Sequence, residues 1–200
     1  MRKILFTASM LFLLPLTAMG QDTPGVEVFG GFSYLHTEGG GNLYGWNGSV
    51  NVNLNKWFGL VVDFSGHYDS SSSRSAIIVT PGTSPVSFRF DSKENFHTFM
   101  VGPRFSLRKH DKVTPFSHLL FGITRRHFES RTEFPGFPLA FSEFNNTGFA
   151  GVAGAGVDVK MTKSLVLRVI QADYLLTRSF GNFQNNARLS TGLVYRFGGN

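Results

Sequence analysis

Hydrophobic and polar residues alternate along residues 49–64, and this pattern predicts two β-strands joined by a tight turn. Between 49 and 54 the even positions are valine or leucine and the odd positions are serine or asparagine. After Asn55 and Lys56, the even positions of 58–64 are again apolar, while Asp63 falls on the other parity. Because successive side chains of a strand point to opposite faces, each strand has one apolar face and one polar face.

Eight segments of the chain show this alternation, and none combines capping residues with an apolar stripe at helical spacing. The eight are Val26–His36, Tyr44–Leu54, Phe58–Tyr68, Phe96–Leu107, Thr114–Phe128, Gly148–Val159, Ser164–Leu176 and Arg188–Phe197. Each is close to the roughly 9–11 residues that a tilted strand needs to cross a bilayer. We therefore predict an all-β fold, an eight-stranded antiparallel up-and-down transmembrane β-barrel.

The connections between these segments alternate strictly between long and short. The short ones are Asn55–Trp57, Arg108–Val113 and Lys160–Lys163, and the long ones are Thr37–Leu43, Asp69–Asn95, Glu129–Thr147 and Thr177–Ala187. Outer-membrane barrels place short turns in the periplasm and long loops outside. We expect four external loops, of which 69–95 and 129–147 are the largest, with the serine run 70–73 at a mobile loop tip.

Residues 1–20 have the composition of a cleaved secretory signal peptide. A basic start is followed by an apolar stretch from Ile4 to Thr17, and Ala18-Met19-Gly20 supplies small residues before Gln21. The sequence thus predicts a signal peptide over 1–20, a barrel domain over 21–200, and export to the bacterial outer membrane. A lipoprotein anchor is not expected, because no cysteine follows the cleavage site.

Composition and charge narrow the class of protein further. The chain has 22 phenylalanines and 23 glycines but no cysteine, although small exported domains often rely on disulfides. Two of its 19 basic residues fall in the signal peptide, so the remainder exceeds the 13 acidic residues by four. These basic residues are scattered along the chain, which gives no support to a nucleic-acid partner.

We expect the apolar face of each strand to contact lipid, because the interior of an eight-stranded barrel has room for few bulky rings. Aromatic residues then lie near the strand ends, with Trp57, Phe58, Tyr195 and Phe197 at the periplasmic side and Tyr34, Tyr44, Trp46 and Tyr68 at the outer side. The opposite parity gives a polar lumen of both charge signs, in which lone charges are unfavourable. We predict a structural charge network formed by Glu27, Asp63, Asp158, Arg104, Arg168, Arg188 and Arg196, with the pairings left open. Pro103, in the middle of a strand, predicts a bulge or a locally open backbone bond.

Three stretches resemble the outer-membrane β-barrel domain family, the OmpA-type eight-stranded transmembrane barrel, and the resemblance covers 21–200. They are MVGPRFSL (100–107), VTPFSHLLFGITR (113–125) and LSTGLVYRF (189–197). The resemblance implies that the last stretch is the closing strand, whose terminal aromatics, Tyr195 and Phe197, are read by the outer-membrane assembly machinery. Nothing after the barrel implies a peptidoglycan-binding domain or a role in cell-wall tethering.

Lipid and lipopolysaccharide are the partners that a barrel of this kind must have. Arg125 and Arg126 fall where the fifth strand should reach the outer surface, near lipopolysaccharide phosphates. Basic side chains pair well with phosphate groups, so we expect a lipopolysaccharide contact there, with ordinary charges at the base of a loop as the alternative. The sequence names no external partner.

The spacing of the candidate residues along the sequence argues against a catalytic site or a metal site. Asp63, Ser65 and His67 share one strand face, but neighbours on that face stand about 7 Å apart, whereas a catalytic triad needs contacts near 3 Å. No histidine has serine two residues later, as lipid A deacylases do, and no His-x-x-x-His pair occurs. We expect no catalytic residue, no cofactor and no metal.

These patterns favour a membrane-embedded structural or surface-interaction scaffold that presents external loops, not an enzyme. Two alternatives remain open. One is a narrow small-solute channel through the charged lumen, and the other is a lipid A-modifying outer-membrane enzyme that uses a different set of residues. A secreted soluble barrel of the lipocalin type is the least favoured possibility, because it would place the rings inside.

Overall fold

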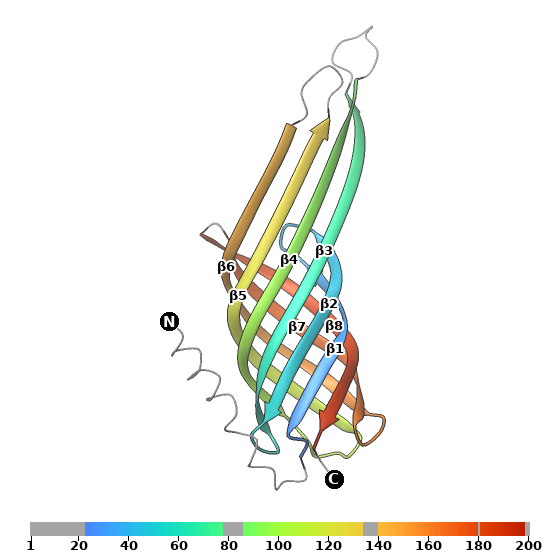
Figure 1. Cartoon of the computed structure of the whole chain (residues 1–200), viewed down its shortest axis with the longest axis vertical. Helices are drawn as coiled ribbons and strands as arrows, with labels where there is room; N and C mark the ends of the chain where they lie inside the picture. The colour runs from blue at the N-terminus through green and yellow to red at the C-terminus, as the bar shows by residue number, and fades with distance from the viewer. Residues whose placement is uncertain (1–22, 78–85, 134–139, 180, 199–200) are drawn as a thin grey trace, which may run out of the picture.

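The computed structural model describes residues 23–77, 86–133, 140–179 and 181–198, and these form a closed antiparallel barrel of eight strands (Figure 1). The strands are β1 (Val26–His36), β2 (Asn42–Asn53), β3 (Phe58–Ile77), β4 (Val86–Ser106), β5 (Val113–Glu133), β6 (Ala140–Lys160), β7 (Leu165–Ser179) and β8 (Asn182–Phe197). The predicted fold class is confirmed, and closure leaves no unpaired strand edge around the barrel wall. The predicted signal peptide, 1–20, lies outside the described residues. The part of the chain described here contains no helix long and apolar enough to cross a membrane.

Neighbouring strands are joined at one end of the barrel by the predicted short turns. In the first turn, Asn55 Oδ1 accepts hydrogen bonds from the backbone N–H of Trp57 (3.0 Å) and of Phe58 (2.8 Å). A side chain that mimics a backbone turn in this way is a common reason for asparagine at such positions. The start of β1 and the end of β8 lie at the same end of the barrel, because Val26 pairs with Phe197.

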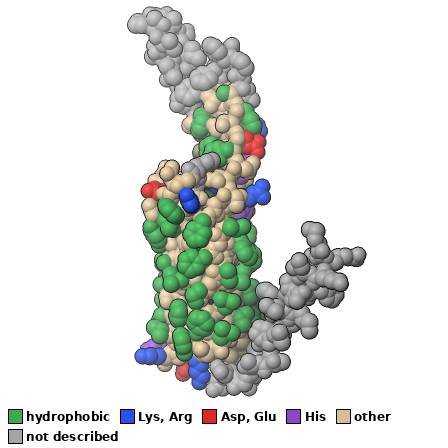
Figure 2. Space-filling view, turned by 90° about the vertical axis from the view of Figure 1, so that its left-hand side faces the viewer, with side chains coloured by type: hydrophobic (Ala, Val, Ile, Leu, Met, Phe, Trp, Pro, Cys, Tyr) green, Lys and Arg blue, Asp and Glu red, His purple; other side chains and the backbone are tan. Residues whose placement is uncertain are grey.

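The barrel is apolar outside and polar inside over most of its length. Trp46, Leu60 and Leu193 are 46–49% exposed on the outer surface, whereas Asp63 and Arg188 are at most 2% exposed in the lumen. Figure 2 shows the outward apolar side chains as a band along the barrel, with charged side chains beyond both of its ends. This inversion is expected for a barrel that contacts lipid tails.

Aromatic rings gather at both ends of this band. Near the short turns, Trp57 stacks on Phe105 with ring centroids 6.1 Å apart, and Tyr195 meets Phe197 edge-on at 4.6 Å. At the opposite end, the rings of Tyr34 and Tyr44 lie 5.4 Å apart. Rings with polar edges favour the headgroup region of a membrane, so these clusters mark the two interfaces.

Three of the four predicted external loops, 69–95, 129–147 and 177–187, are mostly strands, so the sequence-based prediction was wrong there. β3 and β4 stay paired from Phe58↔Phe105 out to Ile77↔Val86, and β5 and β6 stay paired out to Thr132↔Ala140. β4 also pairs with β5 as far as Arg89↔Glu133. The serine run 70–73 is therefore part of β3, not a loop tip. Both faces of this extension meet water, so backbone pairing continues without the apolar alternation that predicts strands.

We call this extension the protruding sheet: β3 69–77, β4 86–95, β5 127–133 and β6 140–145. Figure 1 shows the four strands rising beyond the rest of the barrel, with β3 and β6 at the two sides. The pairing of β2 with β3 ends at Tyr68, and that of β7 with β6 ends at Ala150. Within the described residues, the outer edges of β3 and β6 therefore have no strand beside them above the barrel.

Two irregularities interrupt the ladders. The pairing of β4 with β5 skips Gly102 and Pro103 and resumes in the same register, so Pro103 opens the ladder locally without a bulge. In contrast, β7 has a bulge between Arg168 and Gln171, where its register with both neighbours shifts. This bulge changes which side chains of β7 enter the lumen.

Candidate functional site

The lumen nearest the short turns is organised around the buried carboxylate of Glu27. Arg196 Nε donates to Glu27 Oε1 at 2.8 Å, Arg108 Nη1 donates to the same oxygen at 3.3 Å, and the Asn51 amide donates to Oε2 at 3.3 Å. Arg104 Nη1 lies 3.9 Å from Oε2. Arg108 was not predicted as a partner, because it lies in a short turn beyond the alternating segment.

In a second layer of the lumen, two arginine side chains contact the same carboxylate and the same aromatic ring. Asp158 accepts hydrogen bonds from Arg104 Nη2 and from Arg168 Nε, each at 2.8 Å. Both guanidinium carbons lie over the Phe116 ring, 3.9 and 4.4 Å from its centroid. The ring fills lumen volume and attracts the two cations through its π face.

A third layer is centred on Arg188, which is fully buried. Its Nη1 donates to Asp63 Oδ1 at 2.9 Å, and its Nε donates to Asp173 Oδ2 at 2.8 Å. The second carboxylate also accepts from Gln171 Nε2 and lies 2.8 Å from His118 Nε2. The network thus spans the lumen from β3 to β5, β7 and β8, and all seven residues named from the sequence lie within the three layers.

The bulge in β7 explains why the sequence missed Asp173. Val169 and Ile170 both face outward, 49% and 47% exposed, while Arg168 and Gln171 on either side both face the lumen. Two consecutive outward residues reverse the parity of the rest of the strand. Strict alternation from Arg168 would place Asp173 in lipid, so only the bulge brings it to Arg188.

The three residues with triad-like spacing do not contact one another. Asp63 is bound by Arg188, Ser65 bonds to Thr98 at 2.7 Å, and His67 Nε2 lies 2.8 Å from the hydroxyl of a serine on β1, Ser33. Each is buried in the lumen wall. No group of three His, Asp or Glu side chains arranged to hold a metal ion occurs in the part of the chain that the structure describes.

An apolar layer crosses the lumen outside the ionic layers, where the sequence predicted a polar interior throughout. It consists of Leu35, Leu43, Phe96, Met100, Leu120 and Leu175, each at most 2% exposed and all in one hydrophobic cluster. On β5 and β7, Leu120 and Leu175 lie two residues further out than His118 and Asp173. We call this layer the apolar plug, because its side chains lie in the lumen between the ionic layers and the outer mouth.

Arg125 and Arg126 point to opposite faces of β5. Arg126 turns to the outer mouth of the lumen, where its Nε lies 2.5 Å from Glu94 Oε1 and its Nη1 donates to Gln184 at 3.3 Å. Arg125 is exposed on the outer surface. Of the two arginines expected at lipopolysaccharide, only Arg125 is therefore directed away from the lumen.

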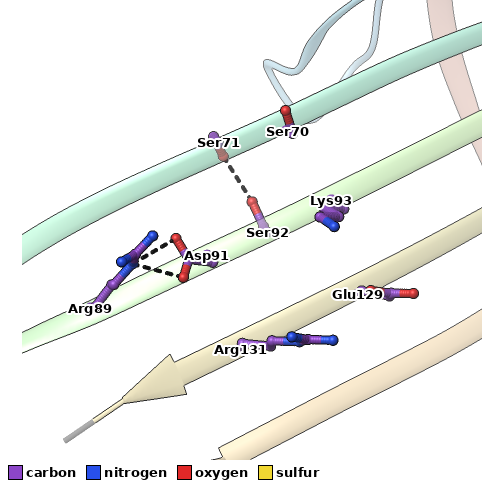
Figure 3. Close-up of a pocket in the computed structure, with 8 residues that line it drawn as sticks. All are labelled: Ser70, Ser71, Arg89, Asp91, Ser92, Lys93, Glu129 and Arg131. Carbon is purple, nitrogen blue, oxygen red and sulfur yellow. Dashed lines mark hydrogen bonds and ion pairs between the residues drawn. The ribbon is translucent and has the colours of Figure 1, made fainter.

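The outer face of the protruding sheet carries a shallow groove of about 300 Å³ lined by charged residues and serines (Figure 3). Arg89 at its rim is held by Asp91 at 2.9 Å. Lys93 and Arg131 also line the groove, and neither forms an ion pair with any described residue, although the Arg131 guanidinium lies 5.6 Å from the Phe141 ring. The groove therefore carries charges of both signs, because Lys93 and Arg131 lie directly opposite Glu129 and Asp91 in the β4–β5 ladder.

Beside the groove, His127 forms an ionic cluster at the base of the protruding sheet. Its Nε2 lies 3.0 Å from Glu129 Oε1 and its Nδ1 lies 2.8 Å from Asn145 Oδ1. The hydrogen bond that His127 donates to Glu129 raises the pKa of His127, because it stabilises the imidazolium, and the same contact lowers the pKa of Glu129. The positive charges of Lys93 and Arg131 lower the pKa of Glu129 further.

Comparison with known proteins identifies the family. The model of the outer membrane protein beta-barrel domain matches residues 4–197. The chain belongs to this family. It is a small outer-membrane barrel, and a search of curated proteins finds no significant match.

Several solved structures are similar to this family member at low sequence identity. Ail, the attachment invasion locus protein of Yersinia pestis, solved with the heparin analogue sucrose octasulfate, is 17% identical, with a TM-score of 0.57 over 88% of this chain and 99% of that one. OprG of Pseudomonas aeruginosa is 12% identical, with a TM-score of 0.49 over 89% and 98%. Neisserial surface protein A is 13% identical, with a TM-score of 0.46 over 86% and 96%. At 17% identity, the similarity to Ail supports the barrel fold and no conclusion about function.

Proposed function

We propose that this outer-membrane barrel is a non-enzymatic, non-conducting anchor that presents the protruding sheet to partners outside the cell. The observation that carries the proposal is the continuation of four paired strands beyond a sealed lumen. A barrel that only filled the membrane would need no ordered sheet above it. The ordered sheet offers a rigid surface, which lowers the entropy lost when a partner binds.

The apolar plug and the ionic layers argue against the channel alternative. An ion entering from the outer mouth meets six buried apolar side chains and then guanidinium groups already held by carboxylates. Eight strands leave an interior that side chains fill. The lipid A-modifying alternative has no support from the side chains of the lumen, where Asp63, Ser65 and His67 each have separate partners.

We expect the assembly signal to reside in Tyr195 and Phe197, whose rings pack against each other on the outer surface at the end of β8. Arg125 is the residue that we expect to contact lipopolysaccharide phosphates, since it alone of the predicted pair faces outward. The signal peptide over 1–20 would bring the chain to the periplasm for assembly.

The experiment compares the full chain with a variant in which both hairpins are shortened. Residues 72–91 and 129–143 are each replaced by Asn-Gly, so that tight turns follow the pairs Ser71↔Ser92 and Phe128↔Phe144. Both proteins should shift on a detergent gel when boiled, fail to conduct in planar bilayers and leave the mass of lipid A unchanged. Only cells that carry the full chain should adhere better to surfaces coated with extracellular matrix. Measurable conductance, or equal adhesion with both proteins, would overturn the proposal.

A further inference from the structure

We infer that the short-turn end of the barrel binds anionic phospholipids, with their phosphate groups held against a ring of exposed lysines. We call these side chains the lysine collar: Lys56, Lys109, Lys112, Lys160 and Lys163. The inference goes beyond the proposed function, because the collar and the protruding sheet lie at opposite ends of the molecule (Figure 1). It follows from the distribution of charge along the barrel, from two lysines that lie directly opposite each other and from the apolar side chains beside them.

The excess positive charge of the barrel is located at its short-turn end. At the other end, segments 37–43, 69–95, 125–147 and 177–187 contain seven acidic and seven basic residues. In the lumen, four arginines of the strands meet four carboxylates. The three short turns contain six basic residues and one acid. Lysines that are scattered along the sequence are therefore gathered at one end by the up-and-down topology, and Figure 2 shows basic side chains in blue below the apolar band.

The collar lysines have no counter-charge in the part of the protein that the structure describes. All five are exposed, and none forms an ion pair with a described residue. Asp111, the acid of the turns, is also exposed and forms no ion pair with them. Arg108 differs, because its Nη1 lies 3.3 Å from Glu27 Oε1 and its charge is already compensated. Five ammonium groups are thus available to an anion from outside the chain.

Lys112 and Lys160 lie directly opposite each other where the β5–β6 ladder reaches the turns. The register pairs Val113 with Val159, and in the next pair Lys160 N–H donates to Lys112 O at 2.8 Å. The Cα atoms of such a hydrogen-bonded pair stand about 5.5 Å apart, so the two side chains start side by side on one sheet face. Like charges in this position destabilise a sheet. A phosphate between the two ammonium groups removes the repulsion, because its oxygens accept hydrogen bonds from both.

The neighbours of the collar place it at the surface of a membrane. Lys56 is followed by Trp57, which is 57% exposed, and Lys160 is followed by Met161, which is 58% exposed. Trp57 also stacks on Phe105 in the aromatic cluster that marks this interface. A lysine beside lipid-facing side chains lays its apolar stem along them and carries its ammonium group to the level of the headgroups. Lipid phosphates lie at that level.

The collar surrounds the barrel instead of forming one patch. Each of the three short turns, which join β2 to β3, β4 to β5 and β6 to β7, carries at least one of its lysines. This arrangement fits a plane of headgroups around the barrel better than one site for a soluble macromolecule. Outer-membrane barrels direct their short turns to the periplasm, so the ligand is a phospholipid of the periplasmic leaflet. Each basic residue near an anionic membrane surface strengthens binding about fivefold, and salt weakens the effect.

The test uses single tryptophans as reporters of the lipids around them. The chain has two tryptophans, of which Trp57 lies beside the collar and Trp46 lies towards the opposite end of the barrel. Replacing one of them by phenylalanine leaves the other as reporter, and Met161→Trp in a chain without either places a reporter beside Lys160. Each full-length protein is folded into phosphatidylcholine vesicles that contain a minor fraction of lipid with brominated acyl chains, which quench nearby indole fluorescence. The brominated lipid is either phosphatidylglycerol or phosphatidylcholine.

The quenching should reveal a preference for the anionic lipid at the collar alone. At position 161 we expect brominated phosphatidylglycerol to bind about tenfold more tightly than brominated phosphatidylcholine, since two lysines act on one phosphate. Trp57 should report a preference of the same sign, and Trp46 should report none. High salt should abolish the preference, because it screens exposed charges.

Variants show whether the paired lysines produce the preference. In the chain with Met161→Trp, Lys112→Gln and Lys160→Gln together should reduce it from about tenfold to about twofold. Lys112→Arg and Lys160→Arg keep both charges and should keep the preference. Lys93→Gln with Arg89→Gln on the protruding sheet removes the same number of charges far from the collar and should change nothing.

Three results would overturn the inference: equal quenching by the two lipids at position 161, a preference that survives neutralisation of Lys112 and Lys160, or the same preference at Trp46. The cell wall is the competing partner, because its peptide stems carry carboxylates. If the protein in neutral micelles binds purified peptidoglycan through Lys112 and Lys160 while the lipid preference is absent, the collar binds the wall and not lipid. Shortening both hairpins of the protruding sheet should leave the lipid preference unchanged, so this inference and the proposed function can fail separately.

Discussion

Arg188 Nε donates to Asp173 Oδ2 at 2.8 Å in the middle of the lumen, although regular alternation along β7 would direct Asp173 into lipid. The bulge at Val169 and Ile170 makes the contact possible, because it reverses the parity of the strand beyond it. A single inserted residue therefore completes a network in which Asp63 binds the other side of the same guanidinium. Removal of that guanidinium is the most direct test of what the network does for stability.

Arg188→Met should destabilise the barrel by about 3–5 kcal/mol, because two buried carboxylates lose the cation between them. Urea unfolding in lipid vesicles measures the loss. Adding Asp63→Asn and Asp173→Asn to the same chain should recover part of it, since neutral amides need no counter-charge. The control is Arg89→Gln on the exposed protruding sheet, for which we expect a change of no more than about 0.5 kcal/mol. Equal effects of the two single substitutions would contradict a structural role for the lumen network.

Phe96→Ala should reduce the free energy of unfolding by about 3–5 kcal/mol, because it opens a cavity in the apolar plug that neighbouring side chains fill only in part. Phe99→Ala, three residues along β4, is the matched control. Phe99 is 46% exposed on the lipid side and contacts Phe64 edge-on at 5.0 Å. Lipid can occupy the space it leaves, so we expect a smaller loss of about 1 kcal/mol, mainly from the ring pair. A larger effect of Phe99→Ala would mean that the plug is not a packed core.

Leu193→Arg should destabilise the inserted barrel by about 2–4 kcal/mol, because Leu193 faces lipid near the middle of β8. Leu54→Arg makes the same change beside a short turn, where the charge reaches the headgroups, and about 0–1 kcal/mol is expected. Folding into vesicles under a urea gradient gives both values. The difference between the two losses of stability is the decisive quantity. Equal losses at Leu193 and Leu54 would be incompatible with the assigned lipid face.

The His127–Glu129 contact should make the base of the protruding sheet sensitive to pH. The pKa of His127 is raised above its usual 6.5 by Glu129, so the stabilisation it contributes is fully present below pH 6.5 and is lost as pH rises through the higher folded value. Proton resonances of the imidazole followed by NMR report this titration. Glu129→Gln should lower the pKa of His127, while Glu133→Gln, further out on β5, should leave it in place. An unchanged His127 titration in Glu129→Gln would show that the hydrogen bond does not form.

Much of the fold could be predicted because strand parity is visible in the sequence wherever one face meets lipid and the other meets the lumen. Trp46, Leu60 and Leu193 face outward as alternation predicts, and Asn51 and Asp63 face inward. The outer halves of β3 and β6 could not be predicted in this way. Ser71 and Ser92 face each other there and share a hydrogen bond of 2.8 Å, but both faces of the sheet are wet, so no alternation of polarity marks them as strands.

The sequence alone determined the closed eight-stranded barrel, its lipid face and seven of the charged residues in its lumen, because each depends on a period of two along the strands. Tertiary structure decided which charges meet, where apolar side chains cross the lumen and how far the strands rise. Those features depend on the stagger of strands around the barrel and on the bulge in β7, which bring Asp63, Asp173 and Arg188 together from three different strands. Residues from separate strands lie at the same height in the lumen only when the barrel closes, and no local pattern in the sequence predicts that height.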